Sequence, residues 1–357
     1  MSAKTMRRVA ILTGGGDAPG LNAVIRAVTK SLIRQCAAEV IGVEDGYLGL
    51  LQRRVRPLDW QSVCGLAGLG GTVLGTTNRV SPLQHEGRDR CDEVIAYAHE
   101  LRLDGLVAIG GDGTMAIAAA LHRHGLPTIG VPKTIDNDIL YVERSFGFDT
   151  AVATIAEALD RIQTTGQSHG RVMIVETMGR TAGWLALEAG LASSADVILL
   201  PELPYSVQAV AALCRQRLAR QRFTVICIAE GARCIDGEVV VQSFAPGAPQ
   251  SIRLGGVGHV LREQLQPLVA SEVRTTVLGH VQRGGAPTAA DRVLATRFGS
   301  AAADAVRQGA WGTMVSLEKG EMGRVTLARA AAGARNVPLD HPLVECARNI
   351  GVSLGAD

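Results

Sequence analysis

Two short polar segments carry carboxylates beside glycine or beside one another, an arrangement that suits phosphoryl transfer. The first reads GGDGT over residues 110–114. Its glycines let the backbone approach a ligand, and Asp112 offers a hard oxygen for Mg²⁺ that bridges phosphates. The second reads PKTIDND over residues 132–138 and carries Asp136 and Asp138. One carboxylate of such a pair can face a reacting hydroxyl while the other orients substrate or metal.

Each segment also has a purely structural interpretation. An Asp-Asn-Asp sequence is often a surface turn, and GGDGT can be a tight turn in which Thr114 opens and caps the next helix. The pentad is also similar to the pattern of NAD kinases and diacylglycerol kinases. It therefore indicates a phosphoryl donor site better than it indicates any acceptor.

A third glycine-rich segment, TGGGDAPG at residues 13–20, follows the first apolar run. Its backbone N–H groups can converge on an anion, and the next helix would point its positive end there. The spacing matches neither G-x-G-x-x-G nor the Walker motif G-x-x-x-x-G-K-[ST]. Alone, this segment is equally well explained as a structural turn.

Short apolar strands that alternate with helices position these segments. The expected strands are Val9–Thr13, Val40–Val43, Leu106–Ile109, Thr128–Val131, Val172–Val175, Val197–Leu200, Phe223–Ala229 and Thr275–Leu278. The expected helices are Leu21–Ile33, Met115–His122 and Thr181–Leu191. This alternation predicts an α/β fold with parallel sheets covered on both faces. Ligands of such sheets bind at the carboxyl ends of the strands, where the three segments fall.

Bulk composition excludes several classes of protein. The chain has 357 residues, of which 47% are hydrophobic and 20% charged, enough for two compact domains or one large one. A formal net charge of +2 predicts no general attraction to nucleic acid or membrane. Seven cysteines without a C-x-x-C pair argue against a disulfide framework or a zinc site. With no signal segment and no long apolar run, we expect a soluble, cytoplasmic protein.

Six motifs in a fixed order resemble the phosphofructokinase family, from about Arg8 to Phe298. They are TGGGDAPGLNAVIR (13–26), GGDGT (110–114), PKTIDND (132–138), MGR (178–180), PE (201–202) and GHVQRGG (279–285). The resemblance implies an α/β fold of two Rossmann-like, three-layer domains with largely parallel sheets. Residues 1–147 with about 282–332 would bind the phosphoryl donor, and residues 148–281 with about 333–357 would bind fructose 6-phosphate.

The resemblance also implies a glycolytic reaction, the Mg²⁺-dependent transfer of a phosphoryl group to the 1-hydroxyl of fructose 6-phosphate. Asp136 would be the general base, Arg180 a second catalytic residue, and Asp112 the Mg²⁺ ligand. The donor-binding residues would be Gly16, Arg79, Gly111, Asp112, Gly113, Thr114 and Lys133. The segment that carries Arg79 ends one residue later than in the best-known bacterial enzymes, with Asn78 beside the arginine.

The sugar-phosphate site would combine hydroxyl-binding residues with arginines, whose forked guanidinium groups suit phosphate. The resemblance assigns to it Thr134, Asp138, Arg171, Met178, Gly179, Glu230, Arg274, His280 and Arg283. In the family, the arginines that match Arg171 and Arg274 cross from a neighbouring subunit. We therefore expect a homo-oligomer, a dimer or a tetramer, with shared active sites.

The sequence gives two opposite indications about the donor. Members of the family that use pyrophosphate carry a second Asp where this chain has Gly113, because a carboxylate there would crowd the α-phosphate of ATP. Lys133, however, is typical of pyrophosphate users, and it is one of only four lysines in the chain. A blocking side chain excludes ATP whereas an extra lysine does not, so ATP is the predicted donor and pyrophosphate the alternative.

A catalytically inactive regulatory subunit that binds sugar phosphate or nucleotide is a further alternative. Such a protein would be free to lose its base or its metal ligand. Asp112, Thr134, Asp136 and Arg180 are all present, which favours an enzyme.

Overall fold

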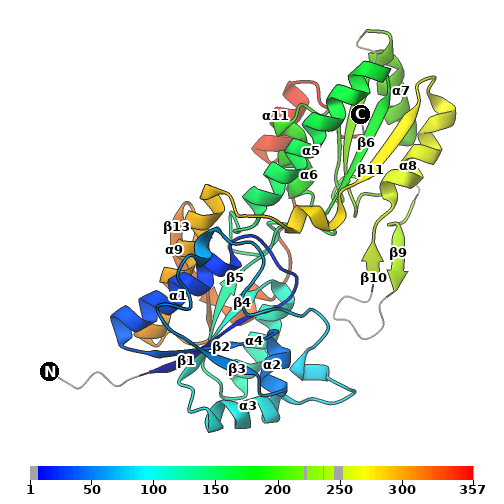
Figure 1. Ribbon diagram of the computed structural model, residues 1–357. Coiled ribbons are helices and arrows are strands. Elements are labelled where there is room, and N and C mark those ends of the chain that lie inside the picture. The colour runs from blue at the N-terminus through cyan, green and yellow to red at the C-terminus, as the bar shows by residue number, and fades with distance from the viewer. Residues whose placement is uncertain (1–6, 221–222, 236, 245–251, 357) are drawn as a thin grey trace.

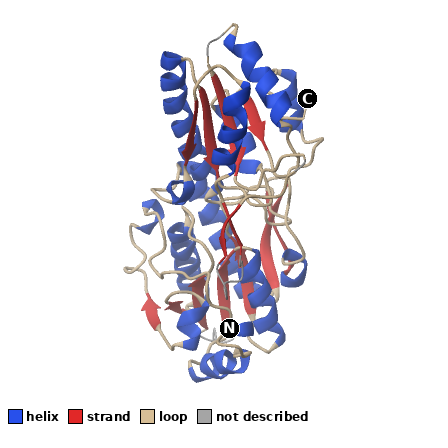
Figure 2. Ribbon diagram, turned by 90° about the vertical axis from the view of Figure 1, so that its right-hand side faces the viewer, coloured by secondary structure: helices blue, strands red, loops and turns tan. Residues whose placement is uncertain are grey.

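The computed structural model describes residues 7–220, 223–235, 237–244 and 252–356. Residues 1–6 and residue 357, which begin and end the two predicted domains, lie outside these ranges. Figure 1 shows two bodies that meet end to end, and Figure 2 shows that each contains a sheet between helices. The predicted α/β class with largely parallel sheets is confirmed.

The larger body contains a seven-stranded sheet whose five central strands are parallel and whose two edge strands are antiparallel. Across the sheet the strands are β13 Glu321–Thr326, β12 Thr313–Glu318, β5 Thr128–Pro132, β4 Gly105–Gly110, β1 Arg8–Thr13, β2 Glu39–Val43 and β3 Val55–Leu58. Its helices are α1 Leu21–Cys36, α2 Tyr47–Leu51, α3 Cys91–Glu100, α4 Asp112–Arg123, α9 Ala289–Gln308 and α10 Leu327–Ala330, with 3-10 turns η1 Leu66–Gly68 and η2 Pro82–Gln84.

The smaller body contains a four-stranded, wholly parallel sheet. Its order is β11 Val273–Val277, β6 Val172–Thr177, β8 Thr224–Ala229 and β7 Val197–Leu199. The helices are α5 Phe148–His169, α6 Trp184–Ala192, α7 Val207–Leu218, α8 Val257–Leu265 and α11 Pro342–Asn349, with 3-10 turns η3 Gln266–Leu268 and η4 Gly279–Arg283. A two-stranded ribbon, β9 Val241–Phe244 and β10 Ile252–Leu254, extends from this body.

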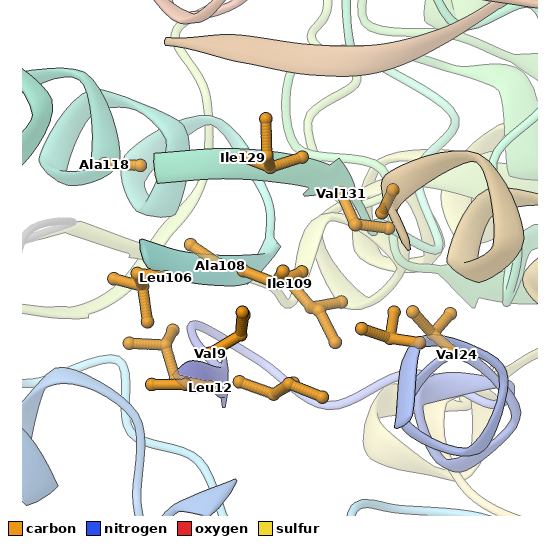
Figure 3. Close-up of a cluster of buried hydrophobic side chains, with 14 of the residues drawn as sticks. Val9, Leu12, Val24, Leu106, Ala108, Ile109, Ala118, Ile129 and Val131 are labelled. Carbon is orange, nitrogen blue, oxygen red and sulfur yellow. The ribbon is translucent and has the colours of Figure 1, made fainter. Parts of the chain in front are cut away.

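Buried aliphatic side chains hold the layers of the larger body together. In Figure 3, Leu106 and Ile109 of β4 lie between side chains of β1 and β5, while Val24 of α1 and Ala118 of α4 lie on opposite sides. Helices α1 and α9 can approach closely because Gly299 has no side chain. A Cβ atom at that position would lie only 2.7 Å from the Cβ of Ala27. Apolar burial of this extent is the main stabilising contribution to such a body.

The chain passes between the two bodies more than once. After β5 it enters the smaller body at α5, returns through η4 and α9, and ends in the smaller body at α11. Val337, Val344 and Leu354 accordingly pack in a hydrophobic core of the smaller body. The residue limits of the two predicted domains stay a prediction.

Two local expectations were wrong. The helix expected from about Thr181 to Leu191 begins at Trp184, and its N-cap residue, Gly183, donates its backbone N–H to the carboxylate of Glu202. Thr114 does not cap α4. The helix begins at Asp112, its N-cap residue is Gly111 without a side-chain cap, and Thr114 lies within the first turn.

Among the described helices, none combines the length and the apolar character that crossing a membrane requires.

Candidate active site

The polar motifs converge where the carboxyl ends of β1, β4 and β5 in the larger body face those of β6 and β8 in the smaller one. The turn η4 joins the two sides. Gln282 accepts a hydrogen bond from the backbone of Met178 at 3.1 Å, and Arg283 donates to the carbonyl of Asp17 at 3.2 Å. Ala18 and Ile135, from two larger-body loops, pack in a core of the smaller body. The junction therefore places donor-side and sugar-side motifs against one another.

Two glycines of the first glycine turn, residues 13–20, are closely packed against other parts of the site. A Cβ atom at Gly14 would lie 2.7 Å from Thr114 Oγ1, and one at Gly16 would lie 2.9 Å from Arg283 Nη1. Thr114 is 5% exposed, so its hydroxyl packs against this turn and against Gly110. The glycines thus bring the first glycine turn into contact with the GGDGT turn and with Arg283, which was predicted for the sugar-phosphate site.

Asp112 lies at the exposed start of α4, where the positive end of the helix dipole favours an anion. Its Oδ1 accepts a hydrogen bond from the backbone of Gly113 at 2.7 Å. A Cβ atom at Gly113 would meet nothing within 4 Å. The space beside Asp112 is therefore open, as required by the prediction that Gly113 leaves room for the α-phosphate of ATP.

The loop over residues 132–138, called the catalytic loop below, holds its two carboxylates through Thr134. The threonine hydroxyl donates to Asp138 Oδ1 at 3.0 Å and accepts from the backbone N–H of Asp136 at 3.0 Å. Asn137 between them adopts the left-handed conformation, with φ of 55°. Asp136 Oδ1 is buried and has no hydrogen-bond partner in the structure. A buried acceptor without a partner is costly, and a substrate proton or a metal ion would satisfy it.

Burial shifts the protonation of both carboxylates. It raises the pKa of Asp136, against the opposing charges of Arg283 and Lys133. Burial and the neighbouring Asp136 raise the pKa of Asp138 to about 7. A raised pKa at a buried carboxylate suits general acid–base work.

Lys133 is directed into the protein. It is 4% exposed, and its Nζ donates to the carbonyl oxygen of Gly16 in the first glycine turn. Burial and the nearby Arg283 lower its pKa to about 8, against the charges of three aspartates. Its predicted contact with a donor phosphate stays a prediction, and the structure shows the ammonium joining the catalytic loop to the first glycine turn.

Three of the predicted sugar-binding residues, Met178, Gly179 and Glu230, follow the carboxyl ends of β6 and β8. Gly179 has φ of 129°, and its carbonyl accepts from the backbone of Gly231 at 3.1 Å. Glu230 follows β8 directly, and burial together with Asp136 raises its pKa to about 7, opposed by Arg283 and Arg180. Glu230 therefore lies within electrostatic reach of the catalytic loop and of both arginines.

Arg79 lies beside the first glycine turn. It is exposed, and its own loop contacts that turn through Thr76, whose hydroxyl donates to the carbonyl of Gly15 at 2.6 Å, and through Thr77, whose carbonyl accepts from Gly15 at 3.2 Å. The structure thus brings the Arg79 loop to the predicted donor site.

Arg171 and Arg274 are not brought to the junction. Arg171 precedes β6 and Arg274 is the second residue of β11, so both lie at the amino end of the smaller sheet. A six-residue strand separates that end from the motif at Met178, a span of roughly 20 Å. Both arginines contact Glu272, with Arg171 Nε at 2.6 Å from its carboxylate. His280 is exposed on η4 near the junction.

Three residues without a predicted role support the site. Gln282 is fully buried and bonds to Met178, and Glu202 accepts from the backbones of Gly183 and Val337. Gln282 belongs to the motif GHVQRGG and Glu202 to the motif PE. The two motifs pointed to these segments of the chain but did not predict these contacts. The third, Arg335, contacts the catalytic loop from the C-terminal segment.

The residues at the junction fit Mg²⁺. Asp112, Asp136 and Asp138 supply hard oxygens, and each of the other two raises the pKa of Asp138. Elsewhere in the described part of the chain, Asp89, Cys91 and His124 have ligand atoms within 4.8 Å of one another. There Asp89 already accepts from the backbone of Cys91, and burial raises the pKa of the Cys91 thiol to about 12. The oxygen-rich junction is the better magnesium site.

Comparison with known proteins assigns the family. The model of the family described as Phosphofructokinase matches residues 8–306. The chain is 47% identical to an ATP-dependent 6-phosphofructokinase of Chloroflexus aurantiacus, over 99% of each chain. It is 46% identical to a pyrophosphate–fructose 6-phosphate 1-phosphotransferase of Amycolatopsis methanolica, over 93% of this chain and 96% of that one.

A solved structure is also similar. The phosphofructokinase of Pichia pastoris in the T-state matches with a TM-score of 0.80 and 32% identity, covering 92% of this chain and 35% of that chain. The chain belongs to the phosphofructokinase family.

Proposed function

We propose that the protein is an ATP-dependent 6-phosphofructokinase of glycolysis, which transfers the terminal phosphoryl group of ATP to the 1-hydroxyl of fructose 6-phosphate. The observation that carries this proposal is the catalytic loop at the junction, where Asp136 has a buried, unpartnered oxygen between the donor turns and Glu230. The name of the Chloroflexus aurantiacus relative supports the same reaction.

Asp136 is the general base in this proposal. It accepts the proton of the 1-hydroxyl while that oxygen attacks the terminal phosphorus of ATP and ADP leaves. Arg283 and Lys133 counter the effect of burial and favour the charged form of the base. Thr134 keeps Asp136 and Asp138 in a fixed relative position.

Asp112 holds Mg²⁺, with Asp138 helping to position metal and sugar. When bound, the ion neutralises part of the charge of the donor phosphates. The first glycine turn and the GGDGT turn cradle those phosphates with backbone N–H groups, and Arg79 contacts the terminal one. The larger body, residues 1–147 with about 282–332, is the donor domain in this proposal.

The smaller body, residues 148–281 with about 333–357, binds fructose 6-phosphate. Glu230 accepts hydrogen bonds from sugar hydroxyls, Met178 and Gly179 line the pocket, and Arg180 binds near the transferring phosphoryl group. Arg283 and His280 bind the 6-phosphate. Arg283 already lies in the junction, as its contact with the backbone of Asp17 supports.

Arg171 and Arg274 complete the 6-phosphate site of a neighbouring subunit. Their position at the amino end of the smaller sheet supports this, because neither reaches the junction of its own chain. The enzyme is accordingly a homo-oligomer with shared active sites, a dimer or a tetramer. We place it in the cytoplasm, which its seven free cysteines support.

Pyrophosphate is the second candidate donor. It is favoured by Lys133 and by the printed activity of the Amycolatopsis methanolica relative. Against it, Gly113 borders open space, and Lys133 is bound to the carbonyl of Gly16. ATP is therefore the donor that we propose.

The deciding experiment measures initial rates of fructose 1,6-bisphosphate formation with Mg²⁺ and either ATP or pyrophosphate. We expect turnover with ATP. Turnover with pyrophosphate alone would assign donor choice to Lys133 and its surroundings. No turnover with either donor, while fructose 6-phosphate still binds, would identify a regulatory subunit.

A further inference from the structure

The C-terminal segment after α10 lies beyond residues 8–306, which the family model matches, yet it contacts both sides of the site. Ala334 pairs with Ile139 in an antiparallel bridge, next to the catalytic loop. The backbone of Arg335 donates to the carbonyl of Asp138 at 2.7 Å. Two residues later, Val337 donates to Glu202, which also accepts from Gly183 on the sugar side. The segment therefore connects the catalytic loop of the larger body to Glu202 and Gly183 of the smaller body.

The side chain of Arg335 makes several of these contacts at once. Its Nε and Nη2 donate to the carbonyl of Asn137 at 3.2 and 2.9 Å, and Nη2 also donates to the carbonyl of Glu143 at 3.0 Å. The guanidinium lies 4.3 Å from the ring centroid of Trp184, whose Nε1 donates to the carbonyl of Arg335 at 2.9 Å. Stacking and hydrogen bonds together fix both the backbone and the side chain of this residue.

The carbonyl that Arg335 binds belongs to the peptide between the two catalytic-loop carboxylates. That peptide is planar and trans, so a carbonyl directed at Arg335 turns the N–H of Asp138 the opposite way, toward the Asp138 carboxylate. Asn137 adopts the left-handed region, where asparagine is found more often than most other residues with a side chain. Its amide oxygen accepts from the backbone of Ser145 at 2.9 Å. The peptide is thus held on one side by Asn137's own side chain and on the other by Arg335.

We propose that Arg335 is a positioning residue for phosphoryl transfer. It holds the peptide between Asp136 and Asp138, and so sets the direction of both carboxylates, without touching either substrate. The inference rests on the proposed function. It adds a residue from outside the six motifs, which acts together with Thr134 and the Asn137 side chain to hold the loop in its observed conformation.

The test compares Arg335→Ala and Arg335→Lys with the full-length wild-type oligomer. For Arg335→Ala we expect kcat to fall roughly 100-fold, while KM for each substrate changes less than about threefold, because a displaced base slows chemistry without removing a binding contact. Lysine keeps the charge but lacks the planar guanidinium that stacks on Trp184 and donates in a fixed fork, so Arg335→Lys should retain about a tenth of the wild-type kcat. Added guanidinium ion should raise kcat of the alanine variant.

Arg348→Ala is the matched control. Arg348 lies in α11, is exposed, and donates to one carbonyl, that of Leu339 at 3.3 Å. We expect wild-type kinetics from this variant and no response to guanidinium. Circular dichroism and the melting temperature of every variant show whether it is folded. If Arg335→Ala fails to fold, the lysine variant decides.

The outcomes separate this inference from the proposed function. A wild-type protein without turnover overturns both. An active wild type together with folded Arg335 variants of unchanged kcat overturns the positioning role alone. A raised KM at constant kcat would likewise overturn it, because it would show a binding contact instead.

Discussion

The two ends of the smaller sheet carry charge in different ways. At the carboxyl end, facing the larger body, burial raises the pKa of Glu230, and the adjacent Asp136 keeps an unpartnered oxygen. At the amino end, Glu272 is exposed and binds both Arg171 and Arg274, which lower its pKa. At the carboxyl end, polar groups lack partners that a ligand could supply, whereas at the amino end the charged groups are already paired. This difference separates the groups that we expect to take part in the reaction from those that we expect to contact a neighbouring subunit.

Removing the base should have the largest effect at the junction end. Asp136→Asn keeps the shape of the side chain but cannot accept the sugar's proton, so we expect kcat to fall about 10³-fold. Steady-state kinetics measures this, and isothermal titration with fructose 6-phosphate checks that binding persists. Activity within tenfold of wild type would move the role of base to Asp138 or Glu230.

The amino end should matter through a neighbouring subunit. We expect Arg274→Ala to raise KM for fructose 6-phosphate roughly 30-fold, since a charge-assisted bond to phosphate is lost. Mixed oligomers of Arg274→Ala and Asp136→Asn should recover activity, because the site of an Arg274→Ala chain then combines its own intact base with an intact arginine from the Asp136→Asn chain.

Arg283→Ala provides the control for that mixture. Arg283 lies in the junction of its own chain, so mixing this variant with Asp136→Asn creates no complete site and should recover no activity. Recovery in both mixtures, or in neither, would contradict the contrast between the two ends of the sheet.

The choice between ATP and pyrophosphate should depend more on the charge of the side chain at position 113 than on its size. A Cβ atom at Gly113 meets nothing within 4 Å, so Gly113→Ala should leave KM for ATP unchanged. Gly113→Asp adds a carboxylate beside nucleotide phosphates, and we expect KM for ATP to rise about tenfold, or ~1.4 kcal/mol. Equal effects of the two substitutions would mean that space rather than repulsion sets the choice.

Much of the framework could be predicted from the sequence. Runs such as Leu106–Ile109 are apolar throughout because both faces of a parallel sheet are buried, so strands β1, β4, β5, β6 and β8 were identified. The motifs then fell at carboxyl ends of strands. Helix α9 was not predicted, because its buried face is largely alanine and glycine and gives a weak hydrophobic period.

The supporting contacts could not be predicted in the same way. Lys133 bonds to Gly16, which is 117 residues away, and Arg335 bonds to Asn137, which is 198 residues away. Only the tertiary fold brings such pairs together, and a lone arginine in an uninformative segment gives no local signal. Arg171 directly precedes an apolar run in the sequence, which places it at the amino end of a strand. Only the structure showed that Glu272 binds it.

The smallest expected effect concerns stability, and it has opposite signs at the two ends of the sheet. The folded-state pKa of Glu230 is raised to about 7, so the folded protein binds an extra proton between the unfolded pKa and that value. Stability from this group is complete below the unfolded pKa and is lost as pH rises toward 7. Glu230→Gln should therefore raise the melting temperature at pH 8 by roughly 2–4 °C and change it little at pH 4.

Glu272→Gln is the matched substitution at the amino end. The pKa of Glu272 is lowered by its arginines, so its contribution is present above the unfolded pKa and is lost as pH falls through the folded value. Removing it should lower the melting temperature slightly at pH 8, and less in high salt, because the pair is exposed. Scanning fluorimetry of both variants at both pH values makes the comparison. A stabilised Glu272→Gln, or a destabilised Glu230→Gln, would show that the two ends do not differ in how their charges are satisfied.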